Sequence, residues 1–241
     1  MEADEYPGPV QGSFPPPARK SPFMSKHASF RPMSGDMPDD SRIIAILPAW
    51  LRPYGRLMRL DRPTGTWLLL LPCLWGVMLF AAAAPVPPGW GEIIRLTVLF
   101  GIGAVVMRGA GCVWNDITDR HYDARVARTT ARPLPTGQVT VFRALLFLLL
   151  LLLVGLAVLW QLRPPAQLTA LLSLVLVAIY PFMKRITFWP QIWLGLTFNW
   201  GVLVAAAEMT AGLPAAAWLL YAAGLFWTLG YDTIYAHQDR E

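Results

Sequence analysis

The sequence predicts an all-α membrane protein, a polytopic bundle of transmembrane helices. Hydrophobic residues make up 55% of the 241 residues and charged residues only 15%, with a mean hydropathy of +0.44, whereas soluble domains carry about 25% charged residues. The apolar residues also gather in six segments, each close to the roughly 20 residues that a helix needs to cross a bilayer. These segments are residues 66–84, 93–114, 140–160, 166–183, 190–207 and 214–231.

Residues 1–45 precede the first apolar segment and differ from it in composition. They are rich in Pro, Ser and Met and show no apolar period, as in GSFPPPARKSPFMS. We therefore expect a disordered segment here and a transmembrane domain over residues 46–241. The stretch lacks the apolar core of a secretory signal, and its acidic start, MEADE, is unlike a mitochondrial transit peptide.

The loops between the apolar segments predict an orientation. Turn residues mark them, as in PVPPGWG, RPLPTG, RPP and AGLP. Arginines gather before the first segment and after the second, and Lys184 and Arg185 follow the fourth, while the other loops carry few cations. By the positive-inside rule these three basic regions face the cytoplasm. We expect a multi-pass protein of the bacterial inner membrane, with its N-terminus inside and no nucleic-acid-binding face.

Two acidic clusters follow apolar segments at this same predicted face. WNDITDRHYD, residues 114–123, follows the second segment, and YDTIYAHQDRE, residues 231–241, follows the sixth. In helical geometry the members of each cluster are spaced to share one helix face. These members are Asn115, Asp119 and Asp123 in the first cluster, and Asp232, Tyr235 and Asp239 in the second.

Carboxylates repeated along one helix face repel each other, and desolvation at the membrane edge adds to the cost. Mg²⁺ offsets both effects, because it takes oxygen ligands and commonly bridges one or two carboxylates to substrate phosphates. Arg128, Arg132 and Lys184 would meet the remaining phosphate charge. The residues alone thus favour a metal-diphosphate site, with a transporter's ion site or solvated ion pairs as the alternatives.

The same stretches resemble a known family. NDITDRHYD and DTIYAHQD resemble the two aspartate motifs of the UbiA superfamily of intramembrane prenyltransferases. LMRLDRPTGTWLLLLPCLWG, RGAGCVWND, RTTARPLPTG and YPFMKR resemble, in that order, the branch that acts on 4-hydroxybenzoate. The resemblance covers about residues 48–241.

The resemblance implies an all-helical enzyme that transfers a polyprenyl group from polyprenyl diphosphate to the ring carbon ortho to the hydroxyl of 4-hydroxybenzoate. The reaction is Mg²⁺-dependent and belongs to ubiquinone biosynthesis. Homogentisate, naphthoate or haem-type acceptors are alternatives, and a cation transporter is another. The family fold has nine helices where this sequence predicts six, so we also expect a C-terminally truncated chain, with an inactive fragment as a further alternative.

The resemblance also implies residue roles. The Mg²⁺ ligands are Asp119, Asp123, Asp232 and Asp239, with Asn115 beside them. The substrate-binding residues are Arg108 for the acceptor's carboxylate, Arg128 and Lys184 for phosphate oxygens, Tyr180 and Tyr235 in the pocket, and Arg62 and Asp61 as further candidates. From spacing alone, Asp116 points away from the shared face. Glu208 is expected on the far side of the membrane, as a solvated loop residue.

Overall fold

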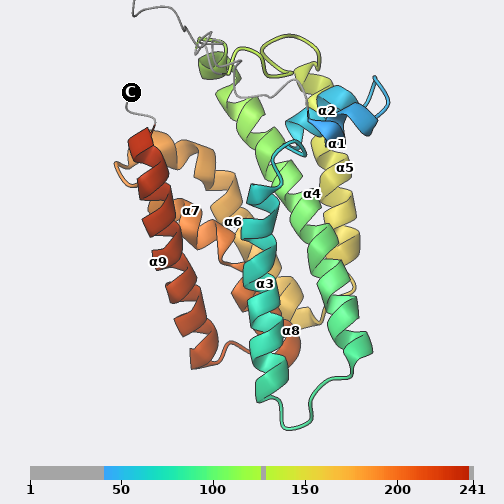
Figure 1. Ribbon diagram of the computed structural model, residues 1–241, viewed down its shortest axis with the longest axis vertical. Helices are drawn as coiled ribbons and strands as arrows, with labels where there is room; N and C mark the ends of the chain where they lie inside the picture. The colour runs from blue at the N-terminus through green and yellow to red at the C-terminus, as the bar shows by residue number, and fades with distance from the viewer. Residues whose placement is uncertain (1–40, 126–128, 239–241) are drawn as a thin grey trace, which may run out of the picture. The chain divides into compact units, whose positions relative to one another are not determined.

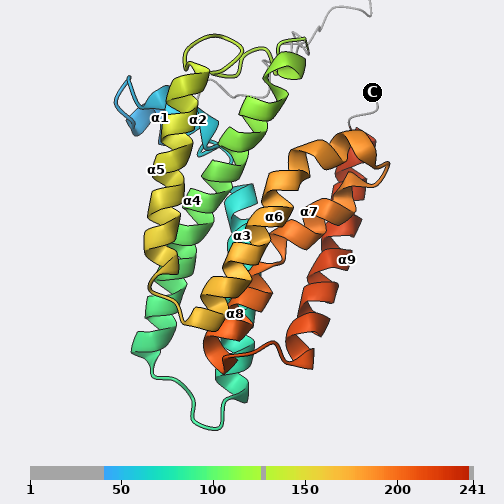
Figure 2. The same cartoon turned by 180° about the vertical axis from the view of Figure 1, so that it is seen from behind.

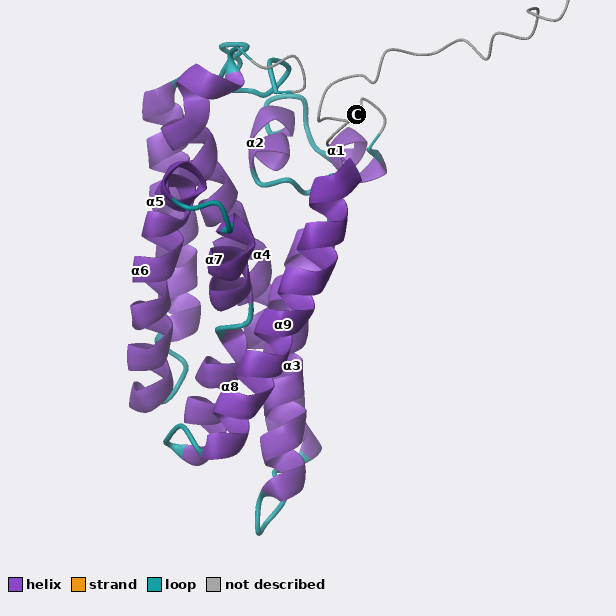
Figure 3. Ribbon diagram, turned by 90° about the vertical axis from the view of Figure 1, so that its left-hand side faces the viewer, coloured by secondary structure: helices purple, strands orange, loops and turns teal. Residues whose placement is uncertain are grey.

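The computed structural model describes residues 41–125 and 129–238, without the side chains of residues 184–185 and 236–238. Within these residues it contains helices and loops and no strand (Figure 3), which confirms the all-α prediction. The helices are α1 (Arg42–Ile46), α2 (Arg52–Leu57), α3 (Thr64–Ala83), α4 (Trp90–Asp123), α5 (Val141–Leu159), α6 (Pro164–Ile186), α7 (Pro190–Phe198), α8 (Gly201–Thr210) and α9 (Ala215–Gln238). The predicted disordered segment, 1–45, lies outside the described residues up to residue 40, and α1 begins within its last residues.

Helix α4 carries the first acidic cluster. Its 34 residues span about 51 Å at 1.5 Å per residue, more than the roughly 30 Å of bilayer hydrocarbon. It therefore continues past the predicted apolar segment 93–114, and Asn115, Asp119 and Asp123 share one helix as predicted. Figures 1 and 2 show the C-terminal ends of α4 and α9 at the same end of the bundle as α1 and α2. The two acidic clusters therefore begin at one end.

Helices α3 and α8 pack closely along their lengths. A Cβ at Gly76 would lie 2.7 Å from the Cβ of Ala205 and 3.1 Å from the carbonyl oxygen of Val202. Only glycine permits this approach of the two backbones. The same helices share a core cluster with α4, in which Val77 and Leu96 are fully buried.

Helix α5 packs on the outer side of α4. Leu145, Leu149 and Leu153 are between 44% and 53% exposed on it, and a helix this apolar on its exposed face is suited to contact with lipid. Its first turn is capped by Thr140, whose hydroxyl accepts a hydrogen bond from the backbone N–H of Arg143 at 3.3 Å.

Five segments of the described chain are long and apolar enough to cross a membrane: Thr64–Ala83, Trp90–Asp123, Val141–Leu159, Pro164–Met183 and Pro190–Thr210. They match the first five predicted segments and make this a multi-pass membrane protein. The sixth, 214–231, forms α9 where it was predicted. It is not among the five, because Trp, Tyr, Thr and Asp residues make its composition less apolar.

The predicted segment 190–207 is not one continuous helix. Helices α7 and α8 separate at Asn199 and Trp200. The Asn199 Nδ2 donates hydrogen bonds of 2.9 Å to the carbonyl oxygen of Gly195 and to the hydroxyl of Thr228 in α9. Irregular backbone at membrane depth is tolerated when it is buried in protein. The predicted segment is found as one apolar span, Pro190–Thr210, but its interruption was not predicted, because nothing local in this apolar run indicates the distant partner.

Candidate functional site

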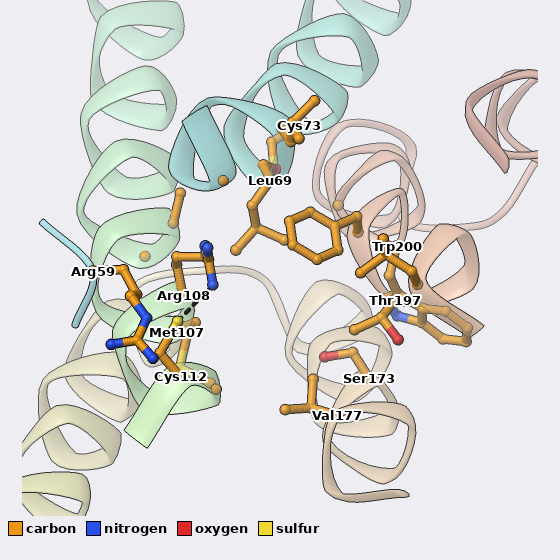
Figure 4. Close-up of a pocket in the computed structure, with 18 of the residues that line it drawn as sticks. Arg59, Leu69, Cys73, Met107, Arg108, Cys112, Ser173, Val177, Thr197 and Trp200 are labelled. Atoms are coloured by element: carbon orange, nitrogen blue, oxygen red, sulfur yellow. Dashed lines mark hydrogen bonds between the residues drawn. The ribbon is translucent and has the colours of Figure 1, made fainter. Parts of the chain in front are cut away.

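A cavity of about 990 Å³ lies among the long helices of the bundle. Much of its wall is apolar, with Leu69, Phe100, Val177 and Trp200 among the residues that line it (Figure 4). Charged residues and one asparagine line it just before α3, along the second half of α4 and near the end of α9. They are Arg59, Asp61, Arg62, Arg108, Asn115, Asp116 and Asp232. An apolar chamber with a charged end suits a ligand that has a long apolar part and an anionic head.

Arg108 reaches from α4 into this cavity toward α3 (Figure 4). Its Nη1 donates to the Sγ of Cys112 at 2.6 Å, and its Nε is buried without a hydrogen-bond partner among the described residues. A Cβ at Gly65 would run into the guanidinium, so the guanidinium lies against the first turn of α3. A thiol is a weak acceptor for a buried cation. The guanidinium is therefore incompletely satisfied and suited to bind an anion that enters the cavity.

Asp116 and Asp123 are held by arginines. The Nη2 of Arg59 donates to both carboxylate oxygens of Asp116, at 2.9 and 3.1 Å. The Nη1 of Arg132 donates to Asp116 at 3.2 Å and to Asp123 at 2.8 Å. One guanidinium thus bridges two carboxylates and offsets their repulsion. Arg132, expected to meet phosphate, contacts the acidic cluster itself.

The structure brings most of the described site predictions to the cavity. The predicted residues that line it are Asp61, Arg62, Arg108, Asn115, Tyr180, Asp232 and Tyr235. Asp119 and Asp123 lie about one and two turns further along α4 and are not part of its lining. Arg128, Asp239 and the side chain of Lys184 lie outside the described residues. The metal and phosphate roles therefore stay predictions.

The oxygen atoms that line the cavity are suitable ligands for Mg²⁺ bound together with a phosphate. Asn115 and Asp232 offer oxygen, while the oxygens of Asp116 accept from arginines, and Mg²⁺ commonly needs only one or two carboxylates beside waters and substrate phosphates. In the part of the chain that the structure describes, no three His, Cys, Asp or Glu side chains form a metal-binding group, which does not fit a closed, zinc-type cage. Desolvation raises the pKa of the Asp232 carboxyl above its usual value, and a nearby cation would favour its ionised form.

The sequence did not indicate Arg59 as a residue of the site, and it indicated Asp61 only as a further candidate. Arg59 was counted only as a loop charge, yet it binds Asp116 and has a φ of 58°, a left-handed conformation that is uncommon outside glycine. The Asp61 side chain is 2% exposed, and both of its carboxylate oxygens are buried without a hydrogen-bond partner among the described residues. The only local signal was the density of charge in MRLDRP.

Glu208 corrects another expectation. It is buried within α8 at 2% exposure, not solvated in a loop. Its Oε2 accepts a hydrogen bond from the backbone N–H of Arg163 at 2.6 Å, and its Oε1 accepts one from Arg95 at 3.3 Å. Arg95 also donates to both carboxylate oxygens of Glu92, at 2.7 and 2.8 Å. The expectation was wrong because α8 extends past the end of the predicted segment and carries Glu208 into the bundle.

Comparison with known proteins finds a family and relatives that are all prenyltransferases. Residues 69–241, more than half of the chain, match the UbiA prenyltransferase family. The mitochondrial 4-hydroxybenzoate polyprenyltransferase of Bos taurus is 48% identical over 200 residues, which are 83% of this chain and 53% of the relative. The 4-hydroxybenzoate octaprenyltransferase of Tolumonas auensis is 46% identical over 202 residues, which are 83% of this chain and 67% of the relative.

A solved structure supports the same fold. The apo structure of a UbiA homolog from Aeropyrum pernix K1 matches with a TM-score of 0.60 and 28% identity, over 74% of this chain and 65% of that one. The human mitochondrial 4-hydroxybenzoate polyprenyltransferase is 47% identical over 199 residues, which are 82% of this chain and 52% of the relative. The chain thus spans about half the length of the mitochondrial relatives that it matches.

Proposed function

The chain belongs to the UbiA prenyltransferase family, and we propose that it transfers a polyprenyl group from polyprenyl diphosphate to 4-hydroxybenzoate, at the ring carbon ortho to the hydroxyl, in ubiquinone biosynthesis. The observation that carries this proposal is the cavity, which joins an apolar chamber to an end that holds Arg108 and several oxygen donors. The names of the relatives support 4-hydroxybenzoate as the acceptor.

Each part of the two substrates has a complementary part of the cavity. The isoprenoid chain suits the apolar wall, which includes Leu69 and Phe100, and it reaches such a site readily because it dissolves in lipid. The acceptor's carboxylate suits the incompletely satisfied guanidinium of Arg108, with which it would form charge-assisted hydrogen bonds. The diphosphate would suit the end lined by Asn115 and Asp232 once Mg²⁺ bound there offsets the repulsion between phosphate and carboxylate.

The reaction needs a leaving group stabilised and water kept away. The allylic C–O bond breaks and diphosphate leaves with the electron pair, while the ring carbon forms the new C–C bond and loses its proton. Bound Mg²⁺ supplies Lewis-acid stabilisation of the leaving diphosphate, and its expected ligands are Asn115, Asp119, Asp123, Asp232 and Asp239. Arg128 and Lys184 are expected to bind phosphate oxygens. The largely apolar wall of the cavity limits capture of the allylic cation by water. Tyr180 and Tyr235 also line the cavity, and aromatic faces stabilise a cation.

The location follows from the loop charges. Three basic regions flank the end of the bundle that carries the acidic clusters, and the positive-inside rule places such regions in the cytoplasm. We propose a bacterial inner membrane with the polar end of the cavity on the cytoplasmic side. The mitochondrial names of the animal relatives make the mitochondrial inner membrane, with this end toward the matrix, the alternative.

The test is an assay of the chain in membranes that lack their own enzyme. Membranes receive 4-hydroxybenzoate and a polyprenyl diphosphate, with Mg²⁺ or with a chelator, and mass spectrometry detects the prenylated acid. We expect product only with Mg²⁺, and a loss of about 100-fold or more in Asp119→Asn, as for removal of one electrostatic stabiliser of a transition state. Glu92→Gln, at the opposite end of the bundle, is the matched control and retains activity.

Homogentisate and a naphthoate acceptor are assayed in parallel. Product from one of these, with none from 4-hydroxybenzoate, would reassign the acceptor. Product that persists in the chelator and in Asp119→Asn would contradict the metal-dependent mechanism. Absence of product with every acceptor would overturn the proposed activity of this chain.

A further inference from the structure

Asp61 is a buried acid whose acceptor oxygens are unused. Its side chain is 2% exposed and lines the cavity, and neither carboxylate oxygen has a hydrogen-bond partner among the described residues. The Nε of Arg62 lies 3.7 Å from Oδ2, which is too long for a hydrogen bond. The Arg62 side chain is 45% exposed, so this ion pair contributes little stability.

Such a group needs an explanation in a folded protein. A buried acceptor without a donor carries a free-energy penalty, and the penalty is larger for a carboxylate. Native proteins satisfy nearly all such groups, and the exceptions often belong to sites that a ligand completes. No contact of Asp61 indicates a role in holding the fold.

A positively charged side chain that lines the same cavity, Arg108, also lacks a hydrogen-bond partner within the described chain at one of its atoms. The Nε of Arg108 is also buried without a partner among the described residues. Its guanidinium lies against Gly65, which follows Asp61 by four residues at the start of α3. One cavity thus presents a donor and an acceptor that both lack a partner. A ligand that completes both carries an anionic group for Arg108 and a hydroxyl donor for Asp61.

We propose that Asp61 accepts a hydrogen bond from the hydroxyl of an aromatic acid whose carboxylate is bound by Arg108. This inference rests on the proposed function and adds to it a second point of recognition. In 4-hydroxybenzoate the two groups lie at opposite ends of one ring, so the two contacts fix the direction of the ring and the place of its ortho carbon. A site built to hydrogen-bond a hydroxyl discriminates strongly against an analogue that lacks it.

The experiment compares three small probes on the purified full chain. Isothermal calorimetry in nanodiscs measures binding of 4-hydroxybenzoate, benzoate and 4-methoxybenzoate, the last two having no hydroxyl to donate. We expect the unsubstituted chain to prefer 4-hydroxybenzoate by about 10- to 100-fold, the range for a hydrogen bond to a charged group. In Asp61→Leu the preference falls to within about threefold, in Asp61→Asn it is intermediate, and in Asp61→Glu it is partly restored. Glu92→Gln is the matched control, and it keeps the full preference.

Two further measurements separate binding from a structural role. The melting temperature of Asp61→Leu without ligand stays the same or rises, because replacing an unsatisfied buried carboxylate with an apolar group removes its penalty. The KM for polyprenyl diphosphate stays unchanged, because Asp61 serves the acceptor. A residue needed for the fold would instead lower the melting temperature and affect both substrates.

The outcomes distinguish this inference from the proposed function. If the unsubstituted chain prenylates 4-hydroxybenzoate and Asp61→Leu keeps the full preference for the hydroxyl, the inference is wrong and the proposed function stands. A lower melting temperature in Asp61→Leu with an unchanged preference also overturns it. If the unsubstituted chain neither binds nor prenylates 4-hydroxybenzoate, both are wrong.

Discussion

Two groups of charged side chains lie at opposite ends of the bundle and are satisfied to different degrees. At the far end, Glu92, Arg95 and Glu208 form a closed set, in which every carboxylate accepts a hydrogen bond from an arginine. At the cavity end, Asp61 and the Nε of Arg108 have no hydrogen-bond partner among the described residues. At the far end Glu208 is buried, while Arg95 and Glu92 are 38% and 39% exposed. Of the two ends, only the cavity end leaves these buried groups of the described chain without a hydrogen-bond partner.

The difference separates charges that hold the fold from charges that bind. A satisfied buried set is costly to break, because removing one partner leaves the other desolvated and unpaired. Substituting a residue of an incomplete set should cost little stability in the protein without substrate. The same substitution should cost much of the free energy of substrate binding. Stability and substrate binding should therefore respond in opposite ways at the two ends.

Replacing the cavity cation should have the largest effect on substrate use. Arg108→Gln removes the charge that we expect to bind the acceptor's carboxylate, and kcat/KM for 4-hydroxybenzoate should fall by about 100-fold or more, as for loss of a charged hydrogen bond in a dry site. The melting temperature should change little. Steady-state kinetics and thermal unfolding on one preparation check this, and a large loss of stability would contradict the comparison.

Breaking the set of Glu92, Arg95 and Glu208 should have the opposite effect, a loss of stability with little change in activity. Glu208→Gln leaves Arg95 without a charged partner in α8 and should lower the free energy of unfolding by about 2 kcal/mol. The kcat/KM per folded molecule should stay within about twofold, because Glu208 is not part of the cavity lining. Denaturant titration in detergent measures the first quantity and the prenylation assay the second. A selective loss of activity would place this residue in the site.

Arg132 tests a set in which both carboxylates, those of Asp116 and Asp123, are paired and which adjoins the cavity. Arg132→Gln removes a donor from both Asp116 and Asp123, but Asp116 keeps Arg59. We expect a loss of about 1.5 kcal/mol in the free energy of unfolding, measured by the same titration. A loss as large as that of a fully unpaired buried charge would show that Arg59 does not compensate.

A substitution at Gly65 should have the smallest effect, because it would move the Arg108 guanidinium without altering its charge. Gly65→Ala places a methyl group where the guanidinium lies and should raise the KM for the acceptor by about tenfold, roughly 1.4 kcal/mol. Gly111→Ala is the matched control, since a Cβ at this other cavity-lining glycine meets nothing within 4 Å. Equal effects of the two substitutions on KM would mean that the position of the guanidinium does not matter.

The sequence predicted what local patterns encode. Apolar length indicated the helices, and the spacing of Asn115, Asp119 and Asp123 indicated one shared face on α4. The sequence did not show which residues far apart in the chain lie close together in space. The left-handed backbone of Arg59 and its bond to Asp116 join residues that are 57 positions apart, and the burial of Glu208 depends on Arg95, far away in the chain.

The same reason explains the interruption at Asn199, whose partner Thr228 lies in another helix. A single polar residue in an apolar run does not by itself end a helix. The amide nitrogen donates here to the carbonyl oxygen of Gly195 in α7 and to the hydroxyl that α9 supplies at that depth. Sequence patterns therefore located the helices and many of the chemical groups, while the pairing of those groups required the fold.

The interruption between α7 and α8 also bears on how the protein is made. With 9 and 10 residues, each half is too short to cross a bilayer alone. The bond from Asn199 to Thr228 ties the break to α9, which is synthesised after both halves. Because α9 follows both halves in the chain, the Asn199 amide gains this acceptor only once α9 is in place, and a substitution of Thr228 would leave the junction of two preceding helices without it.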